Sequence, residues 1–284
     1  MSMNKIKIIS DSTCDLSADL LRQHDIDLVP LFVNFREDSY LDGVNLTASE
    51  MYEKVKQKGF LPTTAAASPG SFETVFQKYL AEGCQILYLG IGAKFSSTLQ
   101  SANLAKQVLG DPKAIHLIDS ANLSSGSGLL LLKAAQFRDA GDDIETVVRK
   151  VQDLVPKVRT QFVINTMEYL YKGGRCNSLV ALMGTILKIK PIIKVRDGLM
   201  TVGKKGHGKI TSGIDILLEE LRAALPDIDP DFLMVTHSLA SESAKYIFEK
   251  IKDVPIAHKY DTPAGCVISS HCGQGCIGIL YIMK

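Results

Sequence analysis

Residues 86–105, ILYLGIGAKFSSTLQSANLA, combine three structural signals in a short stretch. The apolar run from Ile86 to Leu89 predicts a strand, and the glycines at 90 and 92 predict a loop after it. Three hydroxyl residues at 96–98 then lead into a helical pattern over 97–109. The free N–H groups and the dipole at such a helix start attract anions. The segment therefore predicts an anion-binding site, for either a phosphate or a carboxylate.

The rest of the N-terminal half repeats this order of strand and helix. Further strands are predicted at 5–10, 28–35 and 114–118, and further helices at 47–58, 71–81 and 125–140. Such alternation predicts a parallel sheet that is covered by helices on both faces.

A charged amphipathic helix around 141–160 marks a change of composition, after which a second α/β set begins. Its strands are predicted at 161–165, 191–195, 232–236 and 277–282, and its helices at 178–187, 212–224 and 241–252. Asp197-Gly198, between two apolar runs, predicts a hairpin turn. We therefore predict an α/β protein of two domains, 1–158 and 159–284, with mostly parallel sheets and a ligand cleft between them.

The composition of the 284-residue chain limits the kinds of binding partner that we expect for it. A net charge of +1 and the lack of tryptophan give no reason to expect nucleic acid. No run approaches the ~20 apolar residues of a spanning helix, and the N-terminus lacks the apolar core of a signal peptide. We expect a cytoplasmic protein without an integral membrane segment, whose six cysteines are free thiols.

Several polar segments are candidates for the anion site. Asp11-Ser12-Thr13 and Asp119-Ser120 each follow a predicted strand, where α/β sheets place ligands, although helix capping explains them equally simply and is favoured. The segment 62–69, PTTAAASP, supplies neutral donors at Thr63 and Thr64, although taken alone it is typical of a linker. Arg175 follows two glycines that end a predicted helix and is a further candidate.

The segment from Gly203 to Lys209 has the G-x-x-x-x-G-K spacing of a phosphate-binding loop. Position 210 is Ile, however, where a Ser or Thr should hold a metal ion, and Thr211 comes one residue late. The interpretation as a basic turn on a surface hairpin is favoured.

Residues 269–278, SSHCGQGCIG, predict a polar glycine-rich loop before the last strand. His271 could donate to an anion, act as a base or be a plain turn histidine. Together with Cys272 and Cys276 it could also ligate a metal, although the spacing of a structural zinc site is lacking. A Cys–His catalytic pair stays open as well.

Taken in order, these segments resemble one family over essentially the whole chain. The resemblance rests on Asp11–Asp15, Asp42-Gly43, the 63–69 loop, residues 96–102, Asp119-Ser120, 171–175 and 271–275. The chain is similar to the DegV family of two-domain α/β fatty-acid-binding proteins, some of which are binding subunits of a fatty acid kinase.

The resemblance implies that Thr64, Ser96 and His271 hold the fatty-acid carboxylate. Ser97, Thr63, Gly273 and Gly275 are expected to support the site, and Arg175 and His207 are expected to contact a kinase partner. Three features depart from the family pattern: the first loop lacks the usual Thr-Ser-Gln-Pro-Ser-Pro, Ser97 replaces Gly, and His207 replaces Arg.

Two hypotheses follow. The first is a carrier that has no catalytic residue, metal or cofactor, binds a long-chain fatty acid in an apolar tunnel and presents its carboxylate to a separate kinase. The burial of acyl carbons at about 0.8 kcal/mol per CH₂ would supply the affinity, so a few neutral donors suffice for the carboxylate. The second is a small-molecule phosphotransferase or hydrolase that uses His271 and the 203–209 loop.

Overall fold

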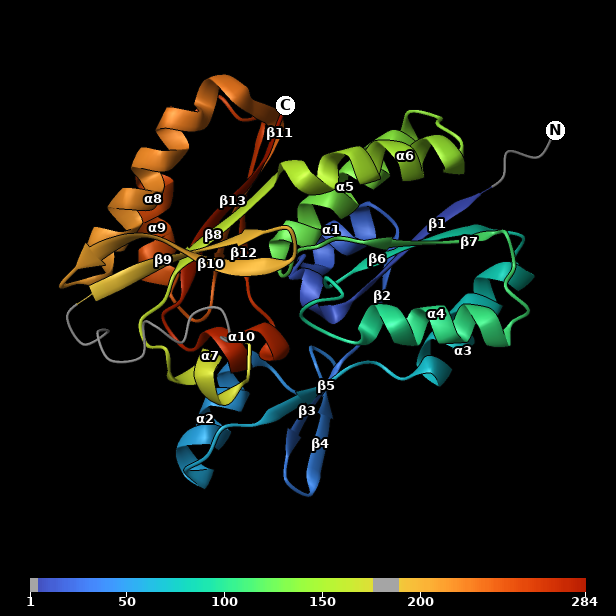
Figure 1. Ribbon diagram of the computed structural model, residues 1–284, viewed down its shortest axis with the longest axis horizontal. Coiled ribbons are helices and arrows are strands. Elements are labelled where there is room, and N and C mark those ends of the chain that lie inside the picture. Colours follow the sequence, from blue (N-terminus) through green and yellow to red (C-terminus); the bar gives the residue numbers. More distant parts are fainter. Residues whose placement is uncertain (1–4, 176–188) are drawn as a thin grey trace.

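The computed structural model describes residues 5–175 and 189–284, and these residues form three sheets (Figure 1). A four-stranded and a six-stranded sheet stand beside each other, and a three-stranded sheet lies at the bottom of the view. On one side of the four-stranded sheet lie α5 (Ser125–Asp139) and α6 (Ile144–Leu154), and on the other lie α3 (Pro69–Ala81) and α4 (Thr98–Val108). The short α1 (Ala18–Gln23) follows the first strand.

The four-stranded sheet has only parallel pairings, as the sequence predicts. Its order is β2 (Ile26–Val29), β1 (Ile6–Asp11), β6 (Gln85–Gly90) and β7 (Ile115–Asp119). Successive side chains of a strand enter opposite cores. Ile8 and Leu87 pack with α5 and α6, whereas Ile9 and Ile86 pack with α3 and α4. The continuous apolar runs are therefore explained by burial on both faces.

The six-stranded sheet differs from the prediction. Its order is β10 (Leu199–His207), β9 (Ile189–Arg196), β8 (Val158–Val163), β13 (Ile277–Met283), β11 (Ile228–His237) and β12 (His258–Pro263). Within the described residues only β11 and β12 pair in parallel, so the prediction of mostly parallel sheets is wrong for this sheet. The hairpin at Asp197-Gly198 is confirmed, and a two-residue turn forces β9 and β10 to run antiparallel.

Helix α5 joins the two large sheets. Leu129 to Leu132 are all fully buried, as expected for a helix that is enclosed on every side. They share one core with Ile8 of the first sheet and with Met234 and Leu280 of the second. The opposite face of the second sheet packs against α8 (Ile210–Ala224) and α9 (Ser241–Lys250).

The strand predicted at 28–35 is divided between two sheets. The chain leaves β2 after Val29, passes Pro30, and enters the small antiparallel sheet as β3 (Phe32–Phe35), between β4 (Asp38–Leu41) and β5 (Thr63–Ala65). Proline has no N–H to donate to a sheet, which suits the point of transfer. Helix α2 (Ala48–Lys58) connects β4 to β5.

The first part of the loop predicted at 269–278, residues 269–272, is instead the end of a helix. This helix, α10 (Cys266–Cys272), belongs to the C-terminal half of the chain, yet Cys266 and Val267 pack into the N-terminal core with Leu46 and Met51. It also packs beside α7 (Glu168–Lys172) (Figure 1). The domain boundary at 158/159 stays a prediction. Helix α10 follows that boundary in the sequence but packs against residues that precede it. The helix predicted at 178–187 lies outside the described residues.

Candidate functional site

The loop between β6 and α4 is held by carboxylates from two strand ends. Asp11 Oδ2 accepts hydrogen bonds from Ile91 N and from Tyr88 OH, each at 2.9 Å, and Asp119 Oδ1 accepts one from Ala93 N at 3.1 Å. A Cβ added to Gly90 would lie 2.0 Å from Asp11 Oδ2, so this approach requires glycine. Both carboxylates therefore shape the loop that carries Ser96.

Asp11 also has the capping role that the sequence favours. It caps the short 3₁₀ turn Ser12–Cys14, accepting from Thr13 N at 3.0 Å, whereas α1 is capped by Ser17.

The three hydroxyls at the start of α4 have distinct environments. Ser96 Oγ lies 2.8 Å from Thr98 Oγ1 and accepts from Thr98 N at 3.3 Å. Thr98 is fully buried, whereas Ser97 is the exposed N-cap residue and makes no side-chain capping bond. Ser96 therefore combines a partly exposed hydroxyl with the N-terminal dipole of an eleven-residue helix.

The structure brings Thr64 and His271 together from 207 residues apart. Thr64 Oγ1, on β5, lies 2.8 Å from His271 Nε2, in the last turn of α10. Among the described residues Nδ1 has no hydrogen-bond partner although it is buried. A Cβ added to Gly173 would lie 2.3 Å from this atom, so the end of α7 covers it closely.

His271 is held in its neutral form. Burial lowers the pKa of its imidazole to about 4, and the positive charge of Arg175 acts in the same direction. Arg175 itself donates to Gly173 O at 2.8 Å and to Phe95 O at 3.4 Å. A neutral imidazole and hydroxyls can hydrogen-bond a carboxylate, with Arg175 as the nearby positive charge.

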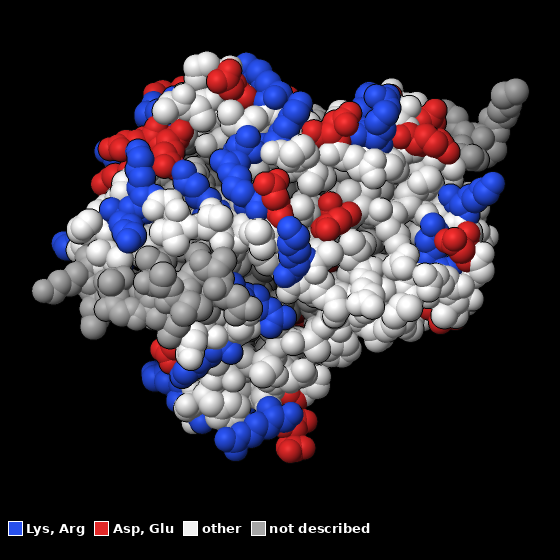
Figure 2. All heavy atoms as spheres, viewed as in Figure 1, with Lys and Arg blue, Asp and Glu red and all other residues white. Residues whose placement is uncertain are grey.

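These side chains line one cavity of about 280 Å³, close to the lower limit for small-molecule pockets of roughly 300 Å³. Its polar lining comes from Thr64, Ser96, Ser97, Arg175 and His271, and its apolar lining includes Leu31, Ile91, Phe95, Leu123, Met200, Val267 and Ile268. It adjoins an open groove of about 490 Å³, where Lys94, Gly198 and Leu199 join the lining. In the view of Figure 1, the surface has basic and acidic side chains interspersed, with broad areas that carry no charged side chain (Figure 2).

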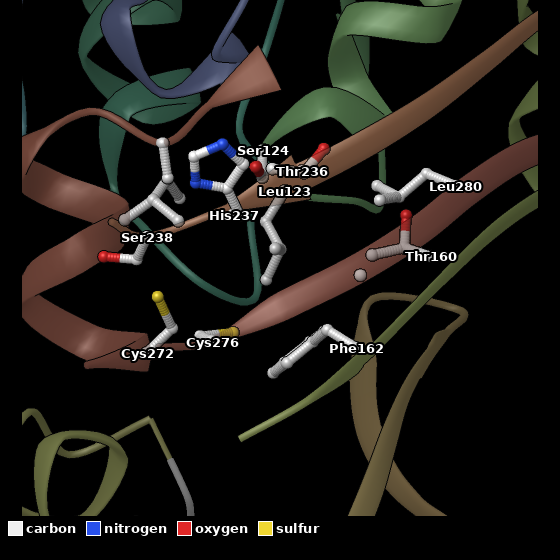
Figure 3. A pocket seen from close by; sticks show the side chains of 13 residues that line it. Leu123, Ser124, Thr160, Phe162, Thr236, His237, Ser238, Cys272, Cys276 and Leu280 are labelled. Atoms are coloured by element: carbon white, nitrogen blue, oxygen red, sulfur yellow. The ribbon is translucent and has the colours of Figure 1, made fainter. Parts of the chain in front are cut away.

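A smaller cavity of about 40 Å³ lies next to the first, and Leu123 and Ile268 line both. Figure 3 shows its lining side chains: Thr160 and Phe162 come from β8, Leu280 from β13, and the sulfurs of Cys272 and Cys276 point into the same space. Its walls are mainly apolar, and the two thiols behave as small apolar groups.

Four of the residues singled out by the sequence lie outside the lining of these cavities. Thr63 is exposed and precedes Thr64 on β5, so its side chain points to the opposite face of the strand. Gly273 and Gly275 form the turn after α10, both with positive φ. His207 ends β10, and roughly 26 Å of strand separate it from Leu199 at the groove.

The segment 203–209, considered as a phosphate-binding loop, does not have the backbone conformation of such a loop. Gly203 to His207 lie in β10, where Lys205 to His207 pair with β9, rather than in a loop wrapped around an anion. Among the described residues, no group of three or more His, Cys, Asp or Glu side chains is placed to hold a metal ion. Within 5–175 and 189–284, no helix has both the length and the apolar character to cross a membrane.

Sequence reasoning missed much of the cavity wall. Phe95, Leu123, Ile268 and Met200 line it but occur in the sequence as ordinary apolar residues. It also missed the anchoring of α10 by Asp15 and Asp42, which accept from Gly265 N and Cys266 N at 2.8 and 2.7 Å. Both residues occur in segments that carry the family resemblance, but no local pattern relates them to residues 265 and 266.

The chain is similar to known proteins over nearly its whole length. A family model described as "Uncharacterised protein, DegV family COG1307" matches residues 5–284. A DegV domain-containing protein of Clostridium acetobutylicum is 31% identical over 295 aligned positions, covering 99% of this chain and all of that protein. A fatty-acid-binding DegV family protein from Thermus thermophilus has a TM-score of 0.91 and 28% identity, covering 99% of this chain and 100% of the other. A stearic acid-binding protein from Eubacterium ventriosum has a TM-score of 0.86 and 27% identity, covering 98% of each chain.

Proposed function

The chain belongs to the DegV family, and from that premise and the geometry of the cavity we propose that it binds a long-chain fatty acid. The observation that carries the proposal is the Thr64–His271 pair, which lines the same largely apolar cavity as Ser96. The related proteins from Thermus thermophilus and Eubacterium ventriosum are both fatty-acid-binding proteins.

The carboxylate would lie against Thr64 and Ser96. When His271 carries its hydrogen on Nε2, it donates to Thr64 Oγ1, and the Thr64 hydroxyl is then free to donate to the ligand. Ser96 accepts from Thr98 N, and when Thr98 Oγ1 is the donor in the contact between the two hydroxyls, the Ser96 hydrogen is available for the carboxylate. Hydrogen bonds to a charged acceptor contribute about 1.5–3 kcal/mol each. The resemblance assigns supporting roles to Ser97, at the cavity edge, and to the turn glycines.

The acyl chain would run from this cavity between Leu123 and Ile268 toward Phe162 and Leu280. Each buried CH₂ contributes about 0.8 kcal/mol, so a long chain supplies most of the affinity. This direction places the carboxylate nearest the open groove and the methyl end deepest in the protein.

We assign phosphorylation of the carboxylate to a separate kinase, with this chain as a carrier. Arg175 lines both the cavity and the open groove, so it is placed where a partner would approach the carboxylate. His207 is the weaker candidate for partner contact because the length of β10 separates it from the groove.

Native mass spectrometry combined with lipid extraction tests the binding function. The purified chain should carry an adduct of about 250–300 Da, since ~14 Da per CH₂ gives this mass for a chain long enough to bind tightly. The matched control is protein stripped of lipid and reloaded with oleic acid. A stripped protein that takes up no oleic acid would contradict the proposal, and ATP turnover without a kinase would favour the enzyme hypothesis.

A further inference from the structure

The start of α10 is anchored by side chains from the opposite end of the sequence. Its N-cap residue is Gly265, which has no side chain to accept from the first N–H groups. Asp15 Oδ1 accepts instead from Gly265 N at 2.8 Å, and Asp42 Oδ1 accepts from Cys266 N at 2.7 Å. Two acidic side chains from the N-terminal half therefore cap the helix that carries His271.

Each of these carboxyls is itself fixed in place. Asp15 Oδ2 is in a short hydrogen bond with Ser124 Oγ, and Asp42 Oδ2 accepts from Ser12 Oγ at 2.9 Å. Asp15 and Asp42 are 7% and 2% exposed, so both contacts are shielded from water. A Cβ added to Gly265 would lie 3.0 Å from Asp42 Oδ1, which shows how closely the backbone approaches.

The anchor and the ligand site lie at opposite ends of one short helix. Seven residues of α-helix span about 10 Å. Since a helix is stiff along its axis, the position of its first turn determines the position of His271 in its last turn.

We propose that Asp15 and Asp42 are positioning residues for the carboxylate site, because they hold α10 where His271 Nε2 stays within hydrogen-bond distance of Thr64 Oγ1. This inference rests on the proposed function, since it concerns the same site. It assigns a role in ligand affinity to two side chains that lie outside the lining of the 280 Å³ cavity.

Asp15 and Asp42 should respond differently to substitution, so the proposal predicts a separate result for each residue. Burial raises the pKa of Asp15 to about 8, and the neighbouring carboxyls of Asp42 and Asp11 add to the shift. An amide therefore resembles the neutral form of Asp15: it can accept from Gly265 N and donate to Ser124. Burial raises the pKa of Asp42 as well, but both of its oxygens accept in the structure: Oδ1 accepts from Cys266 N, and Oδ2 accepts from Ser12 Oγ, which in turn accepts from Leu31 N at 3.1 Å.

A double-mutant cycle with oleic acid as the probe tests the proposal by isothermal titration calorimetry. Asp42→Ala should lower the affinity of the full chain about tenfold or more. In the His271→Ala background, the same change should lower affinity less than twofold, since no imidazole is left to position. Ser12→Ala, which removes the donor to Asp42 and also the acceptor of Leu31 N, keeps both carboxyl anchors and provides a milder version should Asp42→Ala fold poorly.

Two further variants separate positioning from general stability. Asp15→Asn should keep affinity within about twofold while Asp15→Ala loses it, because only the amide preserves the contacts. Asp143→Ala is the matched control: Asp143 caps α6, accepting from Thr146 N at 2.8 Å, so its loss should lower Tm without changing affinity.

The outcomes distinguish this proposal from the proposed function. If the wild-type chain binds no oleic acid, the function itself fails. If it binds and His271→Ala weakens binding, but Asp42→Ala and Ser12→Ala have no effect or act equally in both backgrounds, only the positioning role is overturned.

Discussion

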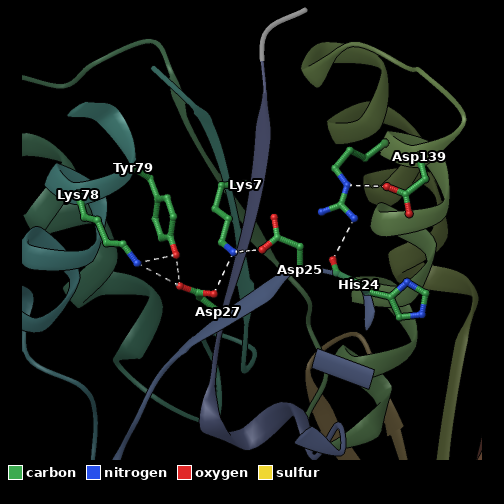
Figure 4. Close-up of polar contacts among 8 residues, drawn as sticks. Lys7, His24, Asp25, Asp27, Lys78, Tyr79 and Asp139 are labelled. Atoms are coloured by element: carbon green, nitrogen blue, oxygen red, sulfur yellow. Dashed lines mark hydrogen bonds and ion pairs between the residues drawn. The ribbon is translucent and has the colours of Figure 1, made fainter. Parts of the chain in front are cut away.

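The buried ionisable side chains near the two ends of strand β1 have opposite kinds of partner. Near its amino end Lys7, only 3% exposed, pairs with Asp25 at 2.5 Å and Asp27 at 2.9 Å, and Tyr79 OH donates to Asp27 (Figure 4). Near its carboxyl end, Asp11 and Asp15 are buried against N–H groups and hydroxyls. At the amino end the buried cation is paired with carboxylates, whereas at the carboxyl end the buried carboxyls have only neutral hydrogen-bond partners.

The pKa directions follow from this difference. Burial opposes the charge on Lys7, but its hydrogen bonds to Asp25 and Asp27 outweigh burial and raise its pKa. At the other end burial dominates and raises the pKa of Asp11 as well as that of Asp15. The carboxyl edge of a parallel sheet is where α/β proteins bind ligands, and here it is built from polar groups with neutral partners. We therefore expect the amino end to contribute stability and the carboxyl end to contribute binding.

The largest expected effect is on binding at the carboxyl end. Replacing Ser96 and His271 together by Ala should lower the affinity for oleic acid at least about 100-fold. The variant loses the Ser96 hydrogen bond to a charged group and the imidazole that orients the Thr64 hydroxyl, which together should cost roughly 3 kcal/mol. Calorimetric titration measures the affinity and thermal unfolding checks that the variant is folded. Unchanged retention of the fatty acid would remove the carboxylate from these residues.

The next effect is on stability at the same end. Gly90→Ala would place a methyl group 2.0 Å from Asp11 Oδ2 and 2.2 Å from the Tyr88 hydroxyl. We expect a loss of about 2–3 kcal/mol in the free energy of unfolding, typical of overpacking, measured by urea denaturation. Gly70→Ala is the control, since its nearest neighbour would be 3.9 Å away. Equal stabilities of the two variants would contradict the close packing of the loop.

The third effect is a dependence of the free energy of unfolding on pH, caused by the lowered pKa of His271. Because its folded-state pKa of about 4 lies below the ordinary value of 6.5, the unfolded chain binds more protons between these values. Stability should therefore be lost as pH falls from about 6.5 toward 4, by about 2 kcal/mol at pH 5. Urea denaturation of the wild type and of His271→Gln from pH 7 to 4.5 measures the difference, and parallel pH profiles would refute it.

The smallest effect tests the amino end. Lys7→Met should cost about 1–2 kcal/mol of stability, because Asp25 and Asp27 are partly exposed and can regain water when the cation is removed. Affinity for oleic acid should stay unchanged. Lys78→Met, at a cation that is 58% exposed, should cost less than about 0.5 kcal/mol. A loss of affinity in Lys7→Met would show that the two ends of β1 are not independent.

The sequence alone determined the elements that depend on neighbours in the chain. The parallel N-terminal sheet, α4 and the turn at Asp197-Gly198 follow from apolar periodicity, glycines and turn residues, because these act within a few positions. The same local signals predicted an anion site at the hydroxyl-rich start of α4, but they could not select Ser96 among residues 96–98 or separate Thr64 from Thr63.

Tertiary structure decided everything that joins distant segments. The periodicity of a strand carries no direction, so the largely antiparallel second sheet could not be foreseen. Residues 266–272 contain no apolar periodicity long enough to predict a helix, and α10 is capped by Asp15 and Asp42 from the other end of the chain. The contact of Thr64 with His271 exists only because α10 packs into the N-terminal core. Local patterns specify which segments fold, whereas the joint burial of many apolar faces specifies which of them meet.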